Sequence, residues 1–346
     1  MSGKRIKALD GLRALAITEI VLYHLQVSVC GGMITRFVIT FFFVLSGYLM
    51  AMHYNDTPPN WSGVKHIVNR RIAHFLPLYW LTLIAVLIFS AWGLRWDLPL
   101  HALLLQSFIP DSYYCFSYNE VAWFVSSLLV CYICFPMLNG IFKRVSLRDQ
   151  IIMFFVIGGV YYLMLYALQP RGDYLYYICP ATRMIDFALG MTLFRVMDEF
   201  SVKSKSLPMS RATVIEVLAI LLAIACNILV YKIPNTLKMV QYTILWYLPV
   251  VMLIVVFSSQ FTSKGVFTRL LSMSLLVKVG LLSMEIYILQ YLTIGLVRKT
   301  VEALNLNLSA WLFIAVLLLV TLGAAIIAHR FITIPVKNWL SQNCKT

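Results

Sequence analysis

Long apolar runs separated by short polar segments recur along the whole chain of 346 residues. A helix needs roughly 20 predominantly apolar residues to cross a bilayer. The runs that approach this length are residues 9–29, 34–52, 76–92, 121–140, 150–168, 181–197, 212–231, 241–258, 279–297 and 309–330. Residues 98–109 are apolar but too short to cross, so we expect them to lie in the interface or to re-enter. The pattern predicts an all-α membrane protein with about ten transmembrane helices.

The basic residues indicate how these helices are oriented. With an even number of spans and a cytoplasmic N-terminus, 20 of the 28 Lys and Arg residues fall in inner segments. Cytoplasmic loops carry such an excess of positive charge, so we expect both termini to be cytoplasmic. The N-terminus is basic, but the first apolar run contains several charges and lacks a small-residue cleavage site. We therefore interpret it as a retained span rather than a signal peptide.

Composition excludes several other classes of protein. With 61% hydrophobic and 12% charged residues, the chain has too little polar surface for a soluble protein of its length. The net charge of +14 is distributed over short loops rather than over a basic domain, so we expect membrane lipids and no nucleic acid as partners. Nothing in the sequence indicates a metal site or defines an oligomeric state. We expect residues 1–346 to form one transmembrane domain without an appended soluble domain.

Two ionisable residues share one face of the first predicted span. Arg13 and His24 are eleven residues apart, which is close to three helical turns, or about 16 Å along the axis. Ionisable side chains inside a span are costly and usually face a bundle interior or a wet cavity. An arginine binds phosphate well, and a histidine further along can act as a general base. The alternative is that Arg13 reaches the inner headgroups and His24 only packs against a neighbour.

Other polar residues mark further positions of interest. Ser46 lies next to a glycine inside a span, where small residues permit close helix contacts or line a cavity. Arg70 and Arg71 form a basic cluster at the predicted inner mouth, where they either bind phosphates or set the topology. Arg183 and Asp186 are three residues apart, a spacing that permits an ion pair on one helix. Structural pairing is the interpretation we favour there.

Several segments match the motifs of one family. Leu9-Asp10-Gly11-Leu12-Arg13-Ala14-Leu15-Ala16, followed by Tyr23-His24, has an Arg-x10-His spacing. Residues 42–49 read Phe-Phe-Val-Leu-Ser-Gly-Tyr-Leu, and Arg70-Arg71 leads to Pro-Leu-Tyr-Trp at residues 77–80. Later landmarks lie at residues 123–136, 183–190, 283–290 and 332–336. Together these segments resemble the acyltransferase-3 family along the whole chain. One departure is that many members have Arg-x-x-Arg where Arg71 is here followed by His74.

This resemblance implies an integral-membrane enzyme that O-acylates cell-surface glycans at a bacterial inner membrane. The implied donor is an acyl-CoA, usually acetyl-CoA, supplied from the cytoplasm, and the implied acceptor is a hydroxyl of a glycan or lipid-linked glycan. The resemblance further implies His24 and Arg13 as catalytic residues. The donor-binding residues would be Arg70, Arg71, His74, Ser46 and Tyr48, supported by Asp10, Arg183, Asp186 and Glu285.

Two function classes fit the sequence. The first is an acetyl-CoA-dependent O-acetyltransferase, with His24 activating either the acceptor hydroxyl or an acyl-receiving group. The alternative is a transporter or flippase that moves a glycan or acyl group without chemistry. The acceptor stays open among O-antigen, enterobacterial common antigen, exopolysaccharide, a lipo-oligosaccharide signal and a peptidoglycan-type glycan, and a succinyl donor also stays open.

Overall fold

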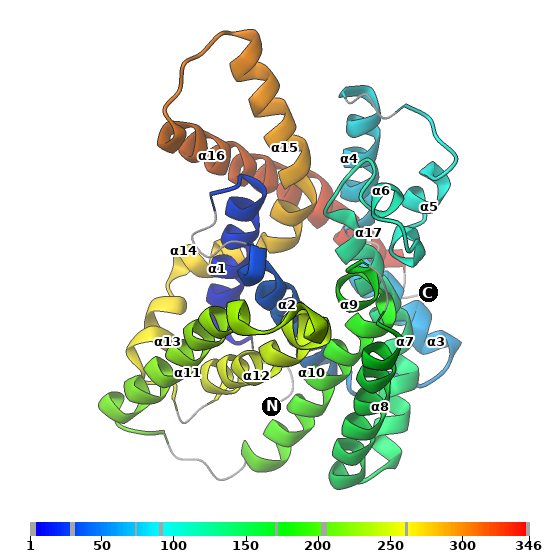
Figure 1. Cartoon of the computed structure of the whole chain (residues 1–346), viewed down its shortest axis with the longest axis vertical. Coiled ribbons are helices and arrows are strands. Elements are labelled where there is room, and N and C mark those ends of the chain that lie inside the picture. The colour runs from blue at the N-terminus through cyan, green and yellow to red at the C-terminus, as the bar shows by residue number, and fades with distance from the viewer. Residues whose placement is uncertain are drawn as a thin grey trace.

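The computed structural model describes residues 5–27, 32–72, 75–89, 93–169, 172–201, 206–259 and 262–343. Helices account for the regular structure in this part of the chain, and no strand occurs in it, so the predicted all-α class is confirmed. The long helices are α1 (Lys7–His24), α2 (Gly32–Tyr54), α4 (Leu76–Phe89), α7 (Ala122–Arg144), α8 (Leu147–Leu168), α10 (Pro180–Ser201), α11 (Met209–Leu229), α12 (Leu245–Ser258), α15 (Ser283–Ala303) and α16 (Ala310–Ala328). Figure 1 shows how they are arranged.

Short helices connect and extend these elements. They are α3 (Trp61–Ile67), α5 (Leu98–Ala102), α6 (Ser112–Cys115), α9 (Tyr174–Tyr177), α13 (Val266–Leu271), α14 (Ser274–Leu281) and α17 (Ile334–Asn343). The described part of the chain also contains the π-helical segments η1 (Val68–Ile72), η5 (Val240–Ile244) and η6 (His329–Thr333). Its 3-10 turns are η2 (Gln106–Phe108), η3 (Val230–Lys232) and η4 (Asn235–Leu237). The apolar segment 98–109 forms only α5 and η2, which are too short to cross a bilayer.

Among the described residues, six helices are long and apolar enough to cross a membrane, or up to eight if each of two bent pairs is one span. The bent pairs are residues 61–71 with α4, at 60°, and α14 with α15, at 67°. The two other predicted spans correspond to α1 and α10, which are helical but contain four and five charged residues. The chain is thus a multi-pass membrane protein, while the count of about ten spans and the location of the termini stay predictions.

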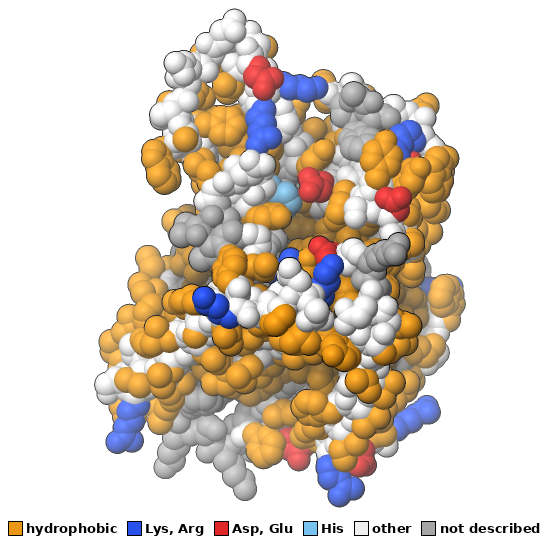
Figure 2. Space-filling model, viewed as in Figure 1, with side chains coloured by type: hydrophobic (Ala, Val, Ile, Leu, Met, Phe, Trp, Pro, Cys, Tyr) orange, Lys and Arg blue, Asp and Glu red, His pale blue; other side chains and the backbone are white. Residues whose placement is uncertain are grey.

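Burial separates inner helices from peripheral ones. The spans built on α2, α7 and α12 are 56–61% buried, whereas those of α8, α11 and α16 are only 17–22% buried. Phe155, Ile157 and Leu163 of α8 are examples of large apolar side chains that stay exposed. Figure 2 shows hydrophobic side chains covering much of one face, with several Lys and Arg side chains near its upper and lower margins. This distribution is what a lipid-facing periphery requires.

The inner helices approach one another closely at glycines. A Cβ atom at Gly47 of α2 would lie 1.9 Å from the carbonyl oxygen of Phe187 in α10. In the reverse direction, a Cβ atom at Gly190 of α10 would lie 1.9 Å from the carbonyl oxygen of Val44 in α2. Gly280 of α14 touches the backbone of α1 in the same way, since its Cβ would lie 1.8 Å from the Asp10 carbonyl oxygen. Only residues without a Cβ permit such backbone contacts. They fix α1 and α2, the two helices that carry Arg13, His24 and Ser46 of the predicted site.

Candidate active site

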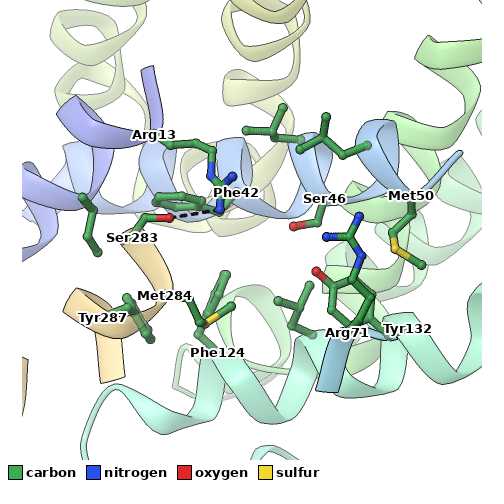
Figure 3. A pocket seen from close by; sticks show the side chains of 14 residues that line it. Arg13, Phe42, Ser46, Met50, Arg71, Phe124, Tyr132, Ser283, Met284 and Tyr287 are labelled. Carbon is green, nitrogen blue, oxygen red and sulfur yellow. Dashed lines mark hydrogen bonds between the residues drawn. The ribbon is translucent and has the colours of Figure 1, made fainter. Parts of the chain in front are cut away.

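A cavity of about 70 Å³ lies among α1, α2, η1, α7 and α15 (Figure 3). Its polar lining consists of Arg13, Ser46, Arg71, Tyr132 and Ser283. The remaining wall is apolar or aromatic and is formed by Ile17, Phe42, Leu45, Leu49, Met50, Phe124, Leu128, Met284 and Tyr287. This space is several times the ~15 Å³ that one water molecule requires. Arg13 and Ser283, which are 270 positions apart in the sequence, therefore line the same small chamber.

Arg13 enters the cavity from α1 and is held on two sides. Its Nη2 donates a hydrogen bond to Ser283 Oγ at 3.0 Å, and its Nη1 lies 3.5 Å from Asp10 Oδ1. Asp10 is shared, because its Oδ2 also accepts a hydrogen bond of 2.6 Å from Arg5 Nε. Figure 3 shows the Arg13 guanidinium directed into the chamber. Ser283 and Asp10 thus orient the guanidinium without fully neutralising it.

Arg71 reaches the same cavity from the π-helical segment η1. Its guanidinium carbon lies 4.9 Å from the centroid of the Tyr54 ring, within cation–π distance. Its Nε is buried and has no hydrogen-bond partner among the described residues. The adjacent Arg70 is exposed, and His74 lies outside the described residues. Of the predicted inner arginine cluster, the structure brings Arg71 into the cavity.

His24 is the last residue of α1 and lies seven residues beyond Ile17, outside the cavity lining. Its Nδ1 is 2.8 Å from the carbonyl oxygen of Ile20, and its half-buried ring contacts the edge of the Tyr23 ring at 5.3 Å. A carbonyl oxygen only accepts hydrogen bonds, so Nδ1 carries the proton in this contact. In a neutral ring Nε2 then bears the lone pair, which is the form that a general base needs.

Aromatic rings form the wall of the cavity near the beginning of α7. The Phe124 and Tyr287 rings are 5.0 Å apart, and the Phe42 and Phe124 rings are 6.1 Å apart. The Tyr287 hydroxyl donates a hydrogen bond of 2.8 Å to the carbonyl oxygen of Val121, which anchors α15 to α7. Rings held in this way keep the chamber narrow and apolar on this side.

Comparison with known proteins identifies the family. An acyltransferase domain family matches residues 6–330. The chain belongs to the acyltransferase-3 family. It is also similar to the peptidoglycan O-acetyltransferase OatA of Listeria monocytogenes serovar 1/2a (strain ATCC BAA-679 / EGD-e), with 31% identity over 130 residues. This match covers 36% of the chain and only 19% of OatA, so the chain spans about a fifth of that relative's length. No solved structure matches the chain.

Other predicted residues of this acyltransferase-3 protein form buried or partly buried contacts outside the cavity lining. Arg183 Nη1 and Asp186 Oδ2 are 2.8 Å apart and fully buried, and Asp186 also accepts a hydrogen bond of 2.8 Å from the Tyr247 hydroxyl. Glu285 Oε1 lies 2.6 Å from His329 Nδ1 in η6. Tyr48 packs edge-on against Phe194, with ring centroids 5.7 Å apart. These contacts connect helices of the acyltransferase fold around the chamber.

Two polar cavity residues were not among the predicted site residues. Tyr132 lies in the apolar run of α7 and Ser283 at the first position of α15. A tyrosine in a span is typical of interfacial positions, so its sequence context does not reveal a chamber. Ser283 does begin one of the segments that resemble the acyltransferase-3 family. Its contact with Arg13 depends on how α1 packs against α15, which only the tertiary structure defines.

Among the described residues, no group of three or more His, Cys, Asp or Glu side chains is arranged to hold a metal ion. The polar groups of the chamber are instead guanidiniums and hydroxyls. Guanidiniums donate hydrogen bonds and carry positive charge, and hydroxyls both donate and accept. The chamber is therefore suited to an anionic or oxygen-rich ligand.

Proposed function

We propose that this protein transfers an acyl group, with acetyl as the leading case, from cytoplasmic acyl-CoA to a hydroxyl of a cell-surface or secreted polysaccharide or its lipid-linked precursor. The main observation behind this proposal is the arrangement of Arg13 and His24 along α1. Arg13 faces a cationic chamber, and His24, with its Nε2 available as a base, follows eleven residues later on the same helix. Both termini would be cytoplasmic in a bacterial inner membrane, with α1 and α10 counted among ten spans.

The spacing along α1 fits the shape of the donor. Eleven residues of helix correspond to about 16 Å, and the pantetheine arm of CoA has a length of roughly half a bilayer of about 30 Å. A donor whose phosphates lie near Arg13 and Arg71 would bring its thioester to the level of His24. Ile17 lies between the two residues on α1 and lines the cavity, so the arm would follow an apolar wall.

His24 would carry the proton transfer. Its Nε2 would accept the proton of the acceptor hydroxyl, or of an acyl-receiving group, as the oxygen attacks the thioester carbonyl. The carbon–sulfur bond then breaks, and His24 would give this proton to the departing CoA thiolate, which restores the neutral imidazole. Ile20 would hold the imidazole in the required tautomer through its carbonyl oxygen. Arg13 would orient the donor and stabilise developing negative charge.

Two findings support a glycan as acceptor. The chain belongs to an acyltransferase family, and the relative OatA is named for O-acetylation of peptidoglycan. The partial match to OatA covers a segment of this chain without fixing which glycan it modifies. We propose a glycan hydroxyl presented on the outer side, because His24 ends the helix opposite the basic N-terminus.

Mass spectrometry of surface glycans tests this function. A deletion strain is complemented with the wild type, His24→Ala or His53→Ala, and glycan acetylation is measured together with the amount of protein in the membrane. His53 is a matched control, because its Nδ1 also lies 2.9 Å from an i−4 carbonyl oxygen in the last turn of its helix. We expect His24→Ala to reduce acetylation by roughly 10²–10⁴-fold, the usual contribution of a general base. The His53→Ala strain should retain it.

Unchanged acetylation in the His24→Ala strain, at equal protein amount, would overturn the proposed chemistry. The donor is tested separately with purified protein and acetyl-CoA. We expect the wild type to bind acetyl-CoA and to release CoA slowly. A protein that neither binds nor hydrolyses acetyl-CoA, in a strain whose glycan export fails, would instead favour transport without chemistry.

A further inference from the structure

The charge of the cavity is unbalanced. Two guanidiniums, those of Arg13 and Arg71, line it, and no carboxylate of the described residues does. Asp10 lies 3.5 Å from Arg13, but it also accepts the shorter contact from Arg5. Arg71 has a buried Nε without a hydrogen-bond partner in the described part of the chain. Both arginines are half-buried, and one shared carboxylate outside the lining faces two guanidiniums inside it, so the chamber favours an anionic ligand.

Tyr132 occupies the wall where this anion would lie. It is 7% exposed and lines the cavity together with Ser46, Arg71 and Arg13. Figure 3 shows the Tyr132 hydroxyl beside the Arg71 guanidinium, on the same side of the chamber as Ser46. Arginines only donate hydrogen bonds, whereas a tyrosine hydroxyl accepts from one group while it donates to another. Tyr132 is thus placed to accept from a guanidinium or Ser46 and to donate to an anionic oxygen.

We propose that Tyr132 is a ligand-binding residue that donates a hydrogen bond to a phosphate held between Arg13 and Arg71. The chamber of about 70 Å³ has room for a group of phosphate size. A phosphate presents several acceptor oxygens, and arginine forks match its geometry. The apolar and aromatic wall on the other side would exclude water and strengthen these hydrogen bonds.

This inference rests on the proposed function for the identity of the phosphate. With acyl-CoA as donor, the group is the phosphate of the CoA diphosphate that is joined to the pantetheine arm. With this phosphate at the level of Arg13, the pantetheine arm would span the distance of about 16 Å along α1 to His24. The adenosine end would extend past η1, where Arg70 is exposed. Tyr132 would therefore contribute to donor affinity and not to the chemistry at His24.

Calorimetric binding to the purified full-length protein in detergent tests the role of Tyr132. The probes are CoA, 4′-phosphopantetheine, pantetheine without phosphate, and inorganic pyrophosphate. The variants are Tyr132→Phe, which removes only the hydroxyl, and Ser46→Ala. Tyr161→Phe is the matched control, because it removes a tyrosine hydroxyl that bonds Thr182 at 2.7 Å outside the cavity. Each variant is also checked for its thermal unfolding midpoint.

We expect Tyr132→Phe to weaken CoA, 4′-phosphopantetheine and pyrophosphate binding about tenfold, as loss of a hydrogen bond to a charged group does. Ser46→Ala should weaken the same three probes less. Pantetheine binding should not change in either variant, and Tyr161→Phe should leave all four probes unaffected. A merely structural role for Tyr132 would weaken pantetheine and CoA to the same extent.

The outcomes separate this inference from the proposed function. If the wild type binds CoA and Tyr132→Phe binds it equally well, the role of Tyr132 is overturned, whereas the acyl-CoA function stands. Equal losses for pantetheine and CoA would also overturn it. Wild-type protein that binds pyrophosphate in a Tyr132-dependent way but does not bind CoA would support the anion site and reject acyl-CoA as the donor.

Discussion

The contact between α2 and α10 depends on glycines, so a single methyl group should disrupt it. We predict that Gly47→Ala destabilises the protein. The added Cβ would lie 1.9 Å from the Phe187 carbonyl oxygen and 3.2 Å from the Met191 nitrogen. Ordinary contacts begin near 3.4 Å, so the two backbones must separate by about 1.5 Å. Neither atom belongs to a side chain that could rotate away.

The magnitude follows from this geometry. Overpacking of a well-packed interior typically costs about 1–3 kcal/mol, and a backbone-to-backbone clash belongs at the upper end of that range. We therefore expect Gly47→Ala to lower the free energy of unfolding by about 3 kcal/mol. The displacement should also reduce donor binding, because Ser46 and Phe42 of the same helix line the cavity.

The free energy of unfolding is measured by titrating the detergent-solubilised protein with SDS, and donor binding is measured on the folded protein. Gly159→Ala in α8 is the matched control, since a Cβ atom added there would have no described neighbour within 4 Å. At that position alanine should be neutral or stabilise the helix by up to ~1 kcal/mol. An unfolding free energy of Gly47→Ala within ~0.5 kcal/mol of the wild type would refute the close backbone contact.

Two further predictions concern residues outside the cavity. Glu216 of α11 is fully buried and accepts hydrogen bonds of 2.9 Å from the backbone nitrogens of Phe267 and Thr268 at the start of α13. Glu216→Ala should therefore cost about 2–3 kcal/mol in SDS unfolding, and an equally stable variant would contradict this anchoring role. Burial lowers the pKa of His101 in α5 below its ordinary value of 6.5, against the opposing effects of the Tyr114 carbonyl and Asp97. The unfolded chain then binds a proton at a higher pH than the folded one, so stability is full above about pH 6.5 and falls as the pH drops below it. The unfolding midpoint of the wild type should be lower at pH 5.5 than at pH 7.5, and His101→Gln should show a smaller difference. Equal pH dependence of the midpoint in both proteins would show that His101 is not responsible for it.

The sequence alone determined the helical class and most helix positions, because long apolar runs have few alternatives in a bilayer. It also singled out Arg13 and His24, since the cost of ionisable residues in spans marks them without any knowledge of packing. The spacing of these residues follows from the regular rise of a helix, so their separation along α1 was predictable as well.

The tertiary structure decided which of the marked residues share a chamber. Arg71 lines the cavity while its neighbour Arg70 is exposed, a difference that depends on how η1 is turned toward α7. Tyr132 and Ser283 join the chamber because α7 and α15 pack around α1 and α2, whereas Arg183 and Asp186 pair with each other away from its lining. Hydrophobic runs specify that a helix forms, but they carry little information about its rotation or its neighbours. In a bilayer those are set by close backbone contacts such as that of Gly47 with Phe187.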